Sequence, residues 1–126
     1  MKTLALALAA LAASAGAASA QYAPMSAATV DRGAAVFSHW CAPCHAKGPG
    51  ADGRRMQAGT LSLTLKYKGE KPGALEDRTD LPAPVLRTFL RAGANAMPAF
   101  RKTEVSDADI EAIATYLQFS SGQRRP

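Results

Sequence analysis

The sequence is poor in the residues from which disulfide frameworks and β-sheets are built. Its 126 residues include only two cysteines, whereas a small exported protein stapled by disulfides normally carries four or more. Valine and isoleucine together number six, and all but Val105 lie in helical patterns. A central sheet would therefore have almost no β-branched residues to be built from.

Long apolar runs are also scarce, because only the N-terminus has one. Lys2 is followed by an apolar run over residues 4–13 and then by Ala18-Ser19-Ala20, which together match the charged, apolar and small-residue regions of a secretory signal peptide. We expect residues 1–20 to be cleaved after Ala20, leaving a mature chain that begins at Gln21. No other segment approaches the roughly 18 apolar residues that cross a bilayer, so the mature protein is expected to lack a membrane span and to be periplasmic.

Charge of one sign is not concentrated anywhere in the chain. The formal net charge is +5, and the basic residues are scattered along the sequence rather than clustered on one element. This pattern does not match the footprint of a nucleic-acid-binding protein. A moderate positive excess can instead steer an acidic protein partner.

The two cysteines that are present stand in one motif, Cys41-Ala42-Pro43-Cys44-His45. C-x-x-C-H is the attachment signature of a c-type haem, in which two thiols add to the haem vinyl groups and the histidine binds the iron. Two intervening residues allow a single helical turn to present both sulfurs along one edge of the porphyrin. The motif accounts for both thiols of the chain at once.

The same residues permit two other interpretations. Trp40-Cys41-Ala42-Pro43-Cys44 also spells W-C-x-P-C, the redox centre of a thioredoxin-like thiol oxidoreductase. A structural disulfide between Cys41 and Cys44 would close a small, strained loop. Residues 46–53 form a glycine-rich loop after the motif, whereas a thioredoxin-like helix continues past the second cysteine, so the order of elements argues against that alternative.

Three helices are expected from periodicity and capping signals. The first begins near Thr29, with Thr29 or Asp31 as its cap, and runs into the C-x-x-C-H motif. The second covers Pro82 to Ala92 and ends at Gly93, with Arg87 and Arg91 on its outer side. The last starts at a capping box of Ser106 and Asp109 and carries an apolar stripe; the sequence turns polar and basic from Gln118 onward.

The segment between the motif and the second helix is less clearly patterned. Leucines alternate over residues 60–67, which fits a short strand, but Leu61 and Leu65 also fit one turn of helix. The charged residues that follow, through Asp80, are expected to form a solvated surface loop.

A second ligand for a haem iron is sought among the methionines. Met97 lies in Ala94-Asn95-Ala96-Met97-Pro98-Ala99-Phe100, a proline-anchored segment that follows the end of a helix. A thioether keeps the iron six-coordinate and favours its reduced state. Met25 precedes the first helix and Met56 lies beside two arginines in a loop, so Met97 is the candidate.

Taken together, these features resemble the class I monohaem cytochromes c. In that family an N-terminal helix with a glycine and an aromatic residue four positions later crosses a C-terminal helix with an aliphatic-x-x-aromatic pair. Here these residues are Gly33 with Phe37 and Ile113 with Tyr116. The resemblance covers residues 29–119 and implies an all-α fold, a small cytochrome c fold with crossing N- and C-terminal helices around a covalent haem.

The resemblance also implies roles for individual residues. Cys41 and Cys44 would bind one haem c through thioethers, His45 would be the proximal iron ligand and Met97 the distal one. Family members usually carry, farther beyond the histidine, a Gly-Pro whose carbonyl orients the imidazole. Here Gly48-Pro49 comes only four residues after His45, so this role is not assigned to Pro49.

These features define the expected domain organisation. Residues 1–20 are the signal peptide, 21–28 an N-terminal lead-in, 29–119 the cytochrome domain and 120–126 a C-terminal tail. The protein is expected to be a one-electron carrier rather than an enzyme. Its docking surface would be a rim of small residues around the haem edge, with Lys47 or Arg101 supplying steering charge, while His39 is expected to be a surface helix residue.

A narrower resemblance concerns the partners. The stretch from Leu81-Pro82 through Met97-Pro98-Ala99-Phe100 is similar to the small cytochrome subunit of flavocytochromes such as p-cresol methylhydroxylase. It implies a flavoprotein dehydrogenase, oxidising an alkylphenol-type substrate, as electron donor, and an oxidase or another cytochrome as acceptor. The alternatives are the thiol oxidoreductase and a haem protein whose sixth iron position is open.

Overall fold

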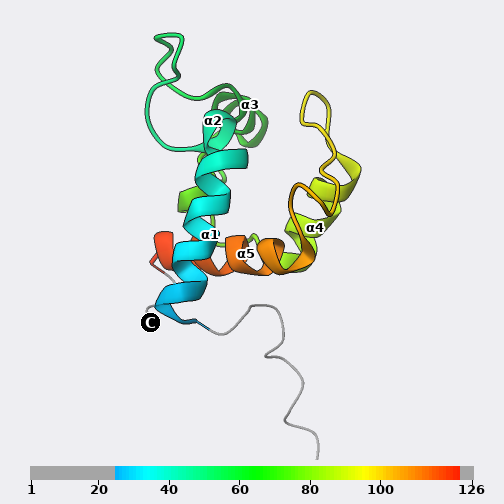
Figure 1. The fold of residues 1–126 in the computed structure, drawn as a ribbon. Helices are drawn as coiled ribbons and strands as arrows, with labels where there is room; N and C mark the ends of the chain where they lie inside the picture. The colour runs from blue at the N-terminus through cyan, green and yellow to red at the C-terminus, as the bar shows by residue number, and fades with distance from the viewer. Residues whose placement is uncertain (1–24, 123–126) are drawn as a thin grey trace, which may run out of the picture.

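The computed structural model describes residues 25–122, which form helices joined by loops (Figure 1). The elements are α1 (Ala27–Trp40), α2 (Ala42–His45), α3 (Ala58–Tyr67), the 3-10 helix η1 (Leu75–Asp77), α4 (Ala83–Ala92) and α5 (Asp107–Ser120). Among these described residues there is no strand, and the one β-bridge joins Ala94 to Met97. The expected all-α fold is confirmed, and the expected signal peptide lies outside the described residues.

Helices α1 and α5 cross steeply and form the centre of the molecule (Figure 1). The crossing depends on Gly33, because a Cβ atom there would overlap the carbonyl oxygen of Ala112 and lie 2.8 Å from the Cβ atom of Tyr116. One turn further along α1, the Phe37 ring packs against the Tyr116 ring with centroids 5.4 Å apart. The predicted pairing of the two helices is therefore confirmed in detail.

The hydrophobic core lies where α5 meets α1 and α4. Ile110, Ile113 and Leu117 place an apolar stripe of α5 against both neighbours, and each is at most 2% exposed, as the helical period of the sequence predicts. The core continues into α4 and the loop before α5. Its other buried members are Phe37, Cys41, Leu81, Ala83, Leu86, Leu90, Val105 and Ala114.

Most of the helix boundaries agree with the sequence signals. Ser106 and Asp109 form the predicted capping box at the start of α5, and Gly93 ends α4 with a φ of 69°. The start of α1 differs, because the cap is Ser26, whose hydroxyl accepts a hydrogen bond from the Thr29 backbone N–H. The helix therefore begins one residue after Ser26 rather than at Thr29 or Asp31.

Three further expectations are resolved or corrected by packing. The leucine-rich segment, for which the sequence allowed a strand or a helix, is helix α3. In this helix Thr60 is buried and Gly59 packs against the motif. Gln118 is buried within α5, so the helix continues where a polar tail was expected. Arg78 was expected on a solvated surface but is 5% exposed, because its guanidinium lies over the Tyr67 ring, 4.7 Å from the ring centroid, and pairs with Asp80.

The elements that carry the site lie on one side of α5. Helices α2 and α3 follow the upper end of α1, and the loop after α4 rises opposite them (Figure 1). Within residues 25–122, no helix combines the length and the apolar character that a bilayer crossing requires.

Candidate haem site

The C-x-x-C-H motif forms a turn of helix at the end of α1. The backbone N–H of Cys41 donates to the Phe37 carbonyl at 2.9 Å, and that of His45 donates to the Cys41 carbonyl at 2.8 Å. Helical hydrogen bonding therefore continues through the motif, which places Cys44 one turn beyond Cys41. Both cysteines are free thiols, Cys41 buried and Cys44 exposed.

The Cys41 thiol does not have the electrostatic environment of a reactive cysteine. Burial, followed by the proximity of Cys44, raises the pKa of Cys41 to about 12. A thiol oxidoreductase requires the opposite shift, because the thiolate is the reacting species. Helix α2 is also only four residues long and is followed by the loop over residues 46–57, which is the reverse of the thioredoxin arrangement.

His45 is held by packing. Its imidazole is half-buried, and desolvation lowers its pKa, which favours the neutral ring that binds iron. A Cβ atom on Gly59 would lie 2.6 Å from His45 Cε1 and 2.7 Å from the Cys44 carbonyl oxygen. Helix α3 therefore packs directly against the ring and fixes its plane.

The buried Nδ1 atom of His45 has no hydrogen-bond partner in the described part of the chain. The Pro49 carbonyl instead accepts a hydrogen bond from Gln57 Nε2 at 3.0 Å. This agrees with the position of Gly48-Pro49, too close to the histidine for the usual role. Histidines that bind metal usually donate their other ring N–H to an acceptor, so it is packing against Gly59, rather than a hydrogen bond at Nδ1, that orients this imidazole.

Met97 lies in a tight turn after α4. The backbone N–H of Ala94 donates to the Met97 carbonyl at 3.0 Å, and the N–H of Met97 donates back to the Ala94 carbonyl at 2.9 Å. Gly93 opens this turn, since a Cβ atom there would lie 2.8 Å from the Met97 carbonyl oxygen. The Met97 side chain is half-buried and packs against the core, so the turn presents it from a fixed backbone.

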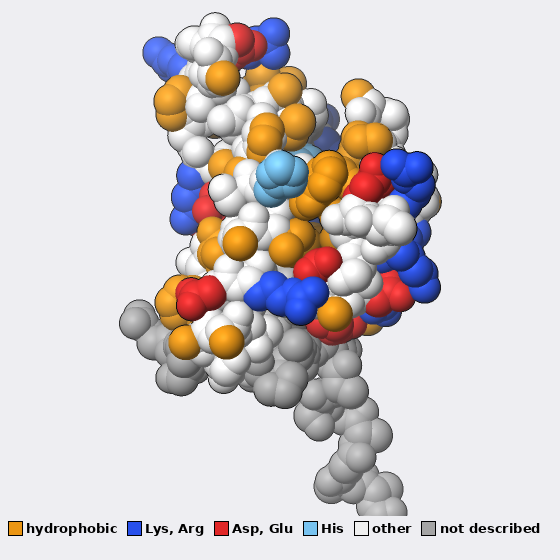
Figure 2. Space-filling view, viewed as in Figure 1, with side chains coloured by type: hydrophobic (Ala, Val, Ile, Leu, Met, Phe, Trp, Pro, Cys, Tyr) orange, Lys and Arg blue, Asp and Glu red, His pale blue; other side chains and the backbone are white. Residues whose placement is uncertain are grey.

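The motif and the Met97 loop form two walls on the same side of α5. The Trp40 ring at the end of α1 meets the Phe100 ring edge-to-face, with centroids 5.8 Å apart, and so joins the walls at one end. Between the two upper lobes of the molecule the surface is hollowed, and hydrophobic side chains gather on both sides (Figure 2). His39 is exposed, as expected, and its ring stands edge-on to Trp40.

The donor set fits a c-type haem. Two free thiols and an adjacent neutral imidazole occupy one helical turn, and a thioether occupies the facing loop. These are the groups that attach haem covalently and ligate its iron in cytochromes. Among residues 25–122, no cluster of three or more histidine, cysteine or acidic side chains offers a competing metal site.

Two residues of the site could not be identified from the sequence. Gly59 lies in a segment whose helix was ambiguous, and only folding brings α3 against His45. Arg91 was expected on the outer side of its helix but is half-buried, and its guanidinium binds the loop that carries Met97. The four-residue spacing from Arg87 was visible in the sequence, but the loop that returns to Arg91 was not.

Comparisons with known proteins place the chain in a family. The family model for subunit III of cbb3-type cytochrome c oxidase matches residues 28–117. A cytochrome c6 of Cyanidioschyzon merolae is 35% identical over 91 residues, which cover 72% of this chain and 74% of that protein. A cytochrome c6 of Cyanidium caldarium is 31% identical over 90 residues, covering 71% of this chain and 70% of that protein.

The matched region contains the crossing helices, the C-x-x-C-H turn and the Met97 loop. Members of this family bind one covalent haem c and typically act as electron carriers. The chain therefore belongs to the monohaem class I cytochromes c, within the family of subunit III of cbb3-type cytochrome c oxidases.

Proposed function

We propose that the haem is attached through Cys41 and Cys44, with His45 and Met97 as the axial ligands of its iron. When bound, the haem supplies an iron that changes between the ferric and ferrous states. The observation that carries the proposal is the placement of the two free thiols and the imidazole in one turn, on the same side of α5 as the Met97 loop.

The protein residues would make this electron transfer fast and reversible. His45 is fixed by its packing against Gly59, and Met97 by its two backbone hydrogen bonds. Rigid ligands need little rearrangement when one electron enters or leaves. A thioether ligand also favours the ferrous state and raises the reduction potential, and the hydrophobic walls would limit the access of water to a bound haem.

The test is an absorption spectrum of protein made in a host with haem-attachment machinery. Haem that remains on the protein through acid-acetone extraction, with sharp low-spin bands after reduction and a thioether band at the red end of the ferric spectrum, supports the proposal. The Met97→Ala variant should keep its haem and lose the thioether band. Cys41→Ser with Cys44→Ser should lose covalent haem.

The same experiment distinguishes the alternative functions. Colourless protein with two titratable thiols would contradict the haem site and favour a thiol oxidoreductase. Covalent haem without a thioether band in the unmodified protein would favour a haem protein with an open sixth position.

We also propose export and a domain boundary. Residues 1–20 would direct secretion to the periplasm and be removed after Ala20, and residues 29–119 would form the cytochrome domain, with 21–28 and 120–126 as flanking segments. Mass spectrometry of protein recovered from a bacterial periplasm should find a chain that begins at Gln21 and carries one haem. Protein that retains residues 1–20 would contradict this proposal.

For the electron donor, we propose a flavoprotein dehydrogenase that oxidises an alkylphenol-type substrate. The support is the similarity of the segment from Leu81 to Phe100 to flavocytochrome subunits. The acceptor would be an oxidase or another cytochrome. Native protein that purifies without a flavoprotein, and that a reduced flavoprotein of this class does not reduce, would contradict the proposed donor without affecting the haem site.

Docking to such a partner would use the small residues around the haem edge. Two flanking cations that could steer the partner are already partly neutralised, because Lys47 pairs with Asp77 at 2.7 Å and Arg101 with Glu104 at 3.1 Å. Their steering effect should therefore be modest. It should appear as a weak dependence of the bimolecular electron-transfer rate on ionic strength.

A further inference from the structure

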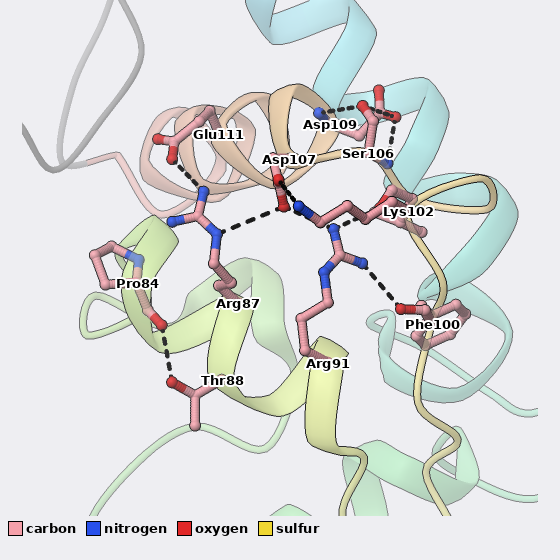
Figure 3. Close-up of polar contacts among 11 residues, drawn as sticks. Pro84, Arg87, Thr88, Arg91, Phe100, Lys102, Ser106, Asp107, Asp109 and Glu111 are labelled. Atoms are coloured by element: carbon pink, nitrogen blue, oxygen red, sulfur yellow. Dashed lines mark hydrogen bonds and ion pairs between the residues drawn. The ribbon is translucent and has the colours of Figure 1, made fainter.

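Arg91 makes contacts that its place on a helix does not require. Its Nη1 atom donates to the Phe100 carbonyl at 2.9 Å, and its Nη2 atom donates to the Val105 carbonyl and to Asp107 Oδ1, each at 2.9 Å (Figure 3). Its Nε atom is buried and has no hydrogen-bond partner in the described part of the chain. The guanidinium is thus held between α4, the loop after it and the first residue of α5.

The two carbonyls that Arg91 binds belong to the segment that follows Met97. Phe100 comes three residues after Met97, and its backbone N–H donates to the Leu90 carbonyl at 2.7 Å. Val105 is fully buried immediately before the capping residue of α5. The loop is therefore anchored to α4 at Phe100 by two hydrogen bonds, one from the backbone and one from Arg91.

A buried carbonyl that loses its donor is costly, and hydrogen bonds from a charged donor are stronger than neutral ones. Without the guanidinium, the Phe100 and Val105 carbonyls would have to find water. The segment would satisfy them by moving outward. Because Phe100 and Met97 are joined by only two intervening residues, that movement would carry the Met97 turn away from the opposite wall.

We infer that Arg91 is a positioning residue for Met97. By binding the Phe100 and Val105 carbonyls, Arg91 holds the Met97 loop, residues 93–105, against α4. This inference rests on the proposed ligation of the iron by Met97. It assigns no contact between Arg91 and the haem, so its effect on the iron is transmitted by the backbone of residues 97–105.

Arg87 provides a matched control on the same helix. It pairs with Glu111 at 3.0 Å and with Asp107 at 3.7 Å. Both partners are side chains of α5, and neither belongs to the loop that carries Met97 (Figure 3). Replacing Arg87 removes a cation and ion pairs from the same interface while it leaves the loop carbonyls bound.

The experiment compares the haem-loaded full chain with Arg91→Gln, Arg91→Lys and Arg87→Gln. Added imidazole is the probe, because it can bind the ferric iron only after the thioether has left. Loss of the thioether band during the titration gives its affinity. Arg91→Gln should raise the apparent affinity for imidazole at least about tenfold, since two partly buried hydrogen bonds from a charged donor to loop carbonyls are lost.

The affinities of the other two variants for imidazole should be lower than that of Arg91→Gln. Arg91→Lys keeps the charge but cannot span three acceptors with one ammonium group, so its affinity for imidazole should lie between that of Arg91→Gln and that of the unmodified protein. Arg87→Gln should stay within about twofold of the unmodified protein, as an exposed ion pair contributes little. Haem content and helical circular dichroism show that each variant is folded.

The outcomes separate this inference from the proposed function. Unmodified protein that shows no thioether band would contradict the ligation by Met97 itself. A normal band in the unmodified protein, with the same imidazole affinity in Arg91→Gln and Arg87→Gln, would overturn the role of Arg91 alone. If Arg91→Gln does not fold, the affinity of Arg91→Lys decides, and a value equal to that of the unmodified protein overturns the inference.

Discussion

At Gly33 and Gly59 the neighbouring groups lie so close that they leave no room for a Cβ atom. Gly33 meets the backbone of α5 at the helix crossing, and Gly59 meets the ring of His45. A glycine inside a helix lowers the stability of that helix by about 1 kcal/mol relative to alanine. At both positions the close packing that glycine allows offsets this loss. Substitution by alanine tests whether the contact outweighs the propensity.

Gly33→Ala should lower the free energy of unfolding, because its Cβ atom would overlap the Ala112 carbonyl, which is backbone and cannot turn away. Overpacking of this kind costs about 1–3 kcal/mol, more than the gain in helix propensity. Urea unfolding followed by circular dichroism measures the change. The control Ser38→Ala, at an exposed site of α1, should change stability by less than about 0.5 kcal/mol; a stabilised Gly33→Ala protein would contradict the close crossing.

Gly59→Ala should disturb the imidazole as well as the stability. Its Cβ atom would lie within 2.8 Å of two ring atoms of His45, so the ring must rotate or α3 must move. We expect a loss of about 1–3 kcal/mol in unfolding free energy and an altered ferric spectrum. Ser62→Ala, at an exposed position of the same helix, should leave both unchanged. An unaltered spectrum in Gly59→Ala would show that α3 does not orient the ring.

At the scale of the element, α5 has a strongly specified start. The Ser106 hydroxyl accepts from the Asp109 N–H at 3.1 Å, and Asp109 Oδ2 accepts from the Ser106 N–H at 2.9 Å. Asp109 also pairs with Arg32 on α1 at 2.8 Å. One carboxylate therefore both caps α5 and fastens it to α1.

Ser106→Ala should destabilise the protein by about 1 kcal/mol, within the range of 0.5–2 kcal/mol for the loss of an N-terminal cap. The midpoint of urea unfolding reports the loss. Thr88→Ala, which removes a hydroxyl that only bonds back to the Pro84 carbonyl on α4, is the control and should have little effect. Equal midpoints for the two variants would mean that the capping box contributes nothing.

Tyr116 connects α5 to the rest of the molecule through a carboxylate. Its hydroxyl donates to Glu76 Oε1 at 3.0 Å, while Glu76 Oε2 accepts from the Lys47 backbone N–H at 3.0 Å. Burial, then the hydrogen bond to Glu76 and its negative charge, raises the pKa of Tyr116 to about 12 from 10.0. Folding therefore favours the protonated phenol.

This shift predicts a pH dependence in the alkaline range. The stabilising contribution of Tyr116 is fully present below pH 10 and should be lost as the pH rises to about 12. Tyr116→Phe has no phenol to ionise, so its stability should fall less steeply over that window. Urea midpoints at several pH values between 9 and 12 test this. Parallel curves for the two proteins would contradict the raised pKa.

At the scale of the whole molecule, the hollow between the motif and the Met97 loop leaves apolar side chains in contact with solvent (Figure 2). Trp40, which precedes the motif and contacts Phe100, is 38% exposed. Proteins of the matched family carry a covalent haem in this fold. The apolar porphyrin would bury surface that the polypeptide alone leaves open.

Cys41→Ser combined with Cys44→Ser should therefore give a less stable protein without covalent haem. We expect a loss of about 2 kcal/mol or more in unfolding free energy, comparable to exposing one large apolar side chain. Wild-type chain made without haem-attachment machinery is the control. If that haem-free chain matched the haem-loaded protein in stability, the haem would not be part of the folded core.

Much of the fold followed from local signals. The loop after His45, the end of α4 at Gly93 and the capping box of α5 each depend on residues close together in the chain, and the structure confirms all three. The Gly33 crossing was also predicted, because a glycine in an otherwise helical stretch indicates close approach of another backbone. Local signals did not decide the structure of residues 60–67, because the positions of the leucines fitted both the two-residue period of a strand and the period of a helix.

The sequence by itself predicted the haem chemistry and determined the helical scaffold, because the C-x-x-C-H spacing, the Met-Pro segment and the capping residues act over a few positions. The tertiary structure decided which side chains serve that chemistry from a distance. Gly59 contacts His45 only because α3 packs on the motif. Arg91 binds the Phe100 carbonyl only because the loop after Met97 returns to α4. Helical periodicity marks Arg91 as a polar position, but it cannot show that the carbonyls of residues 100 and 105 lie opposite it.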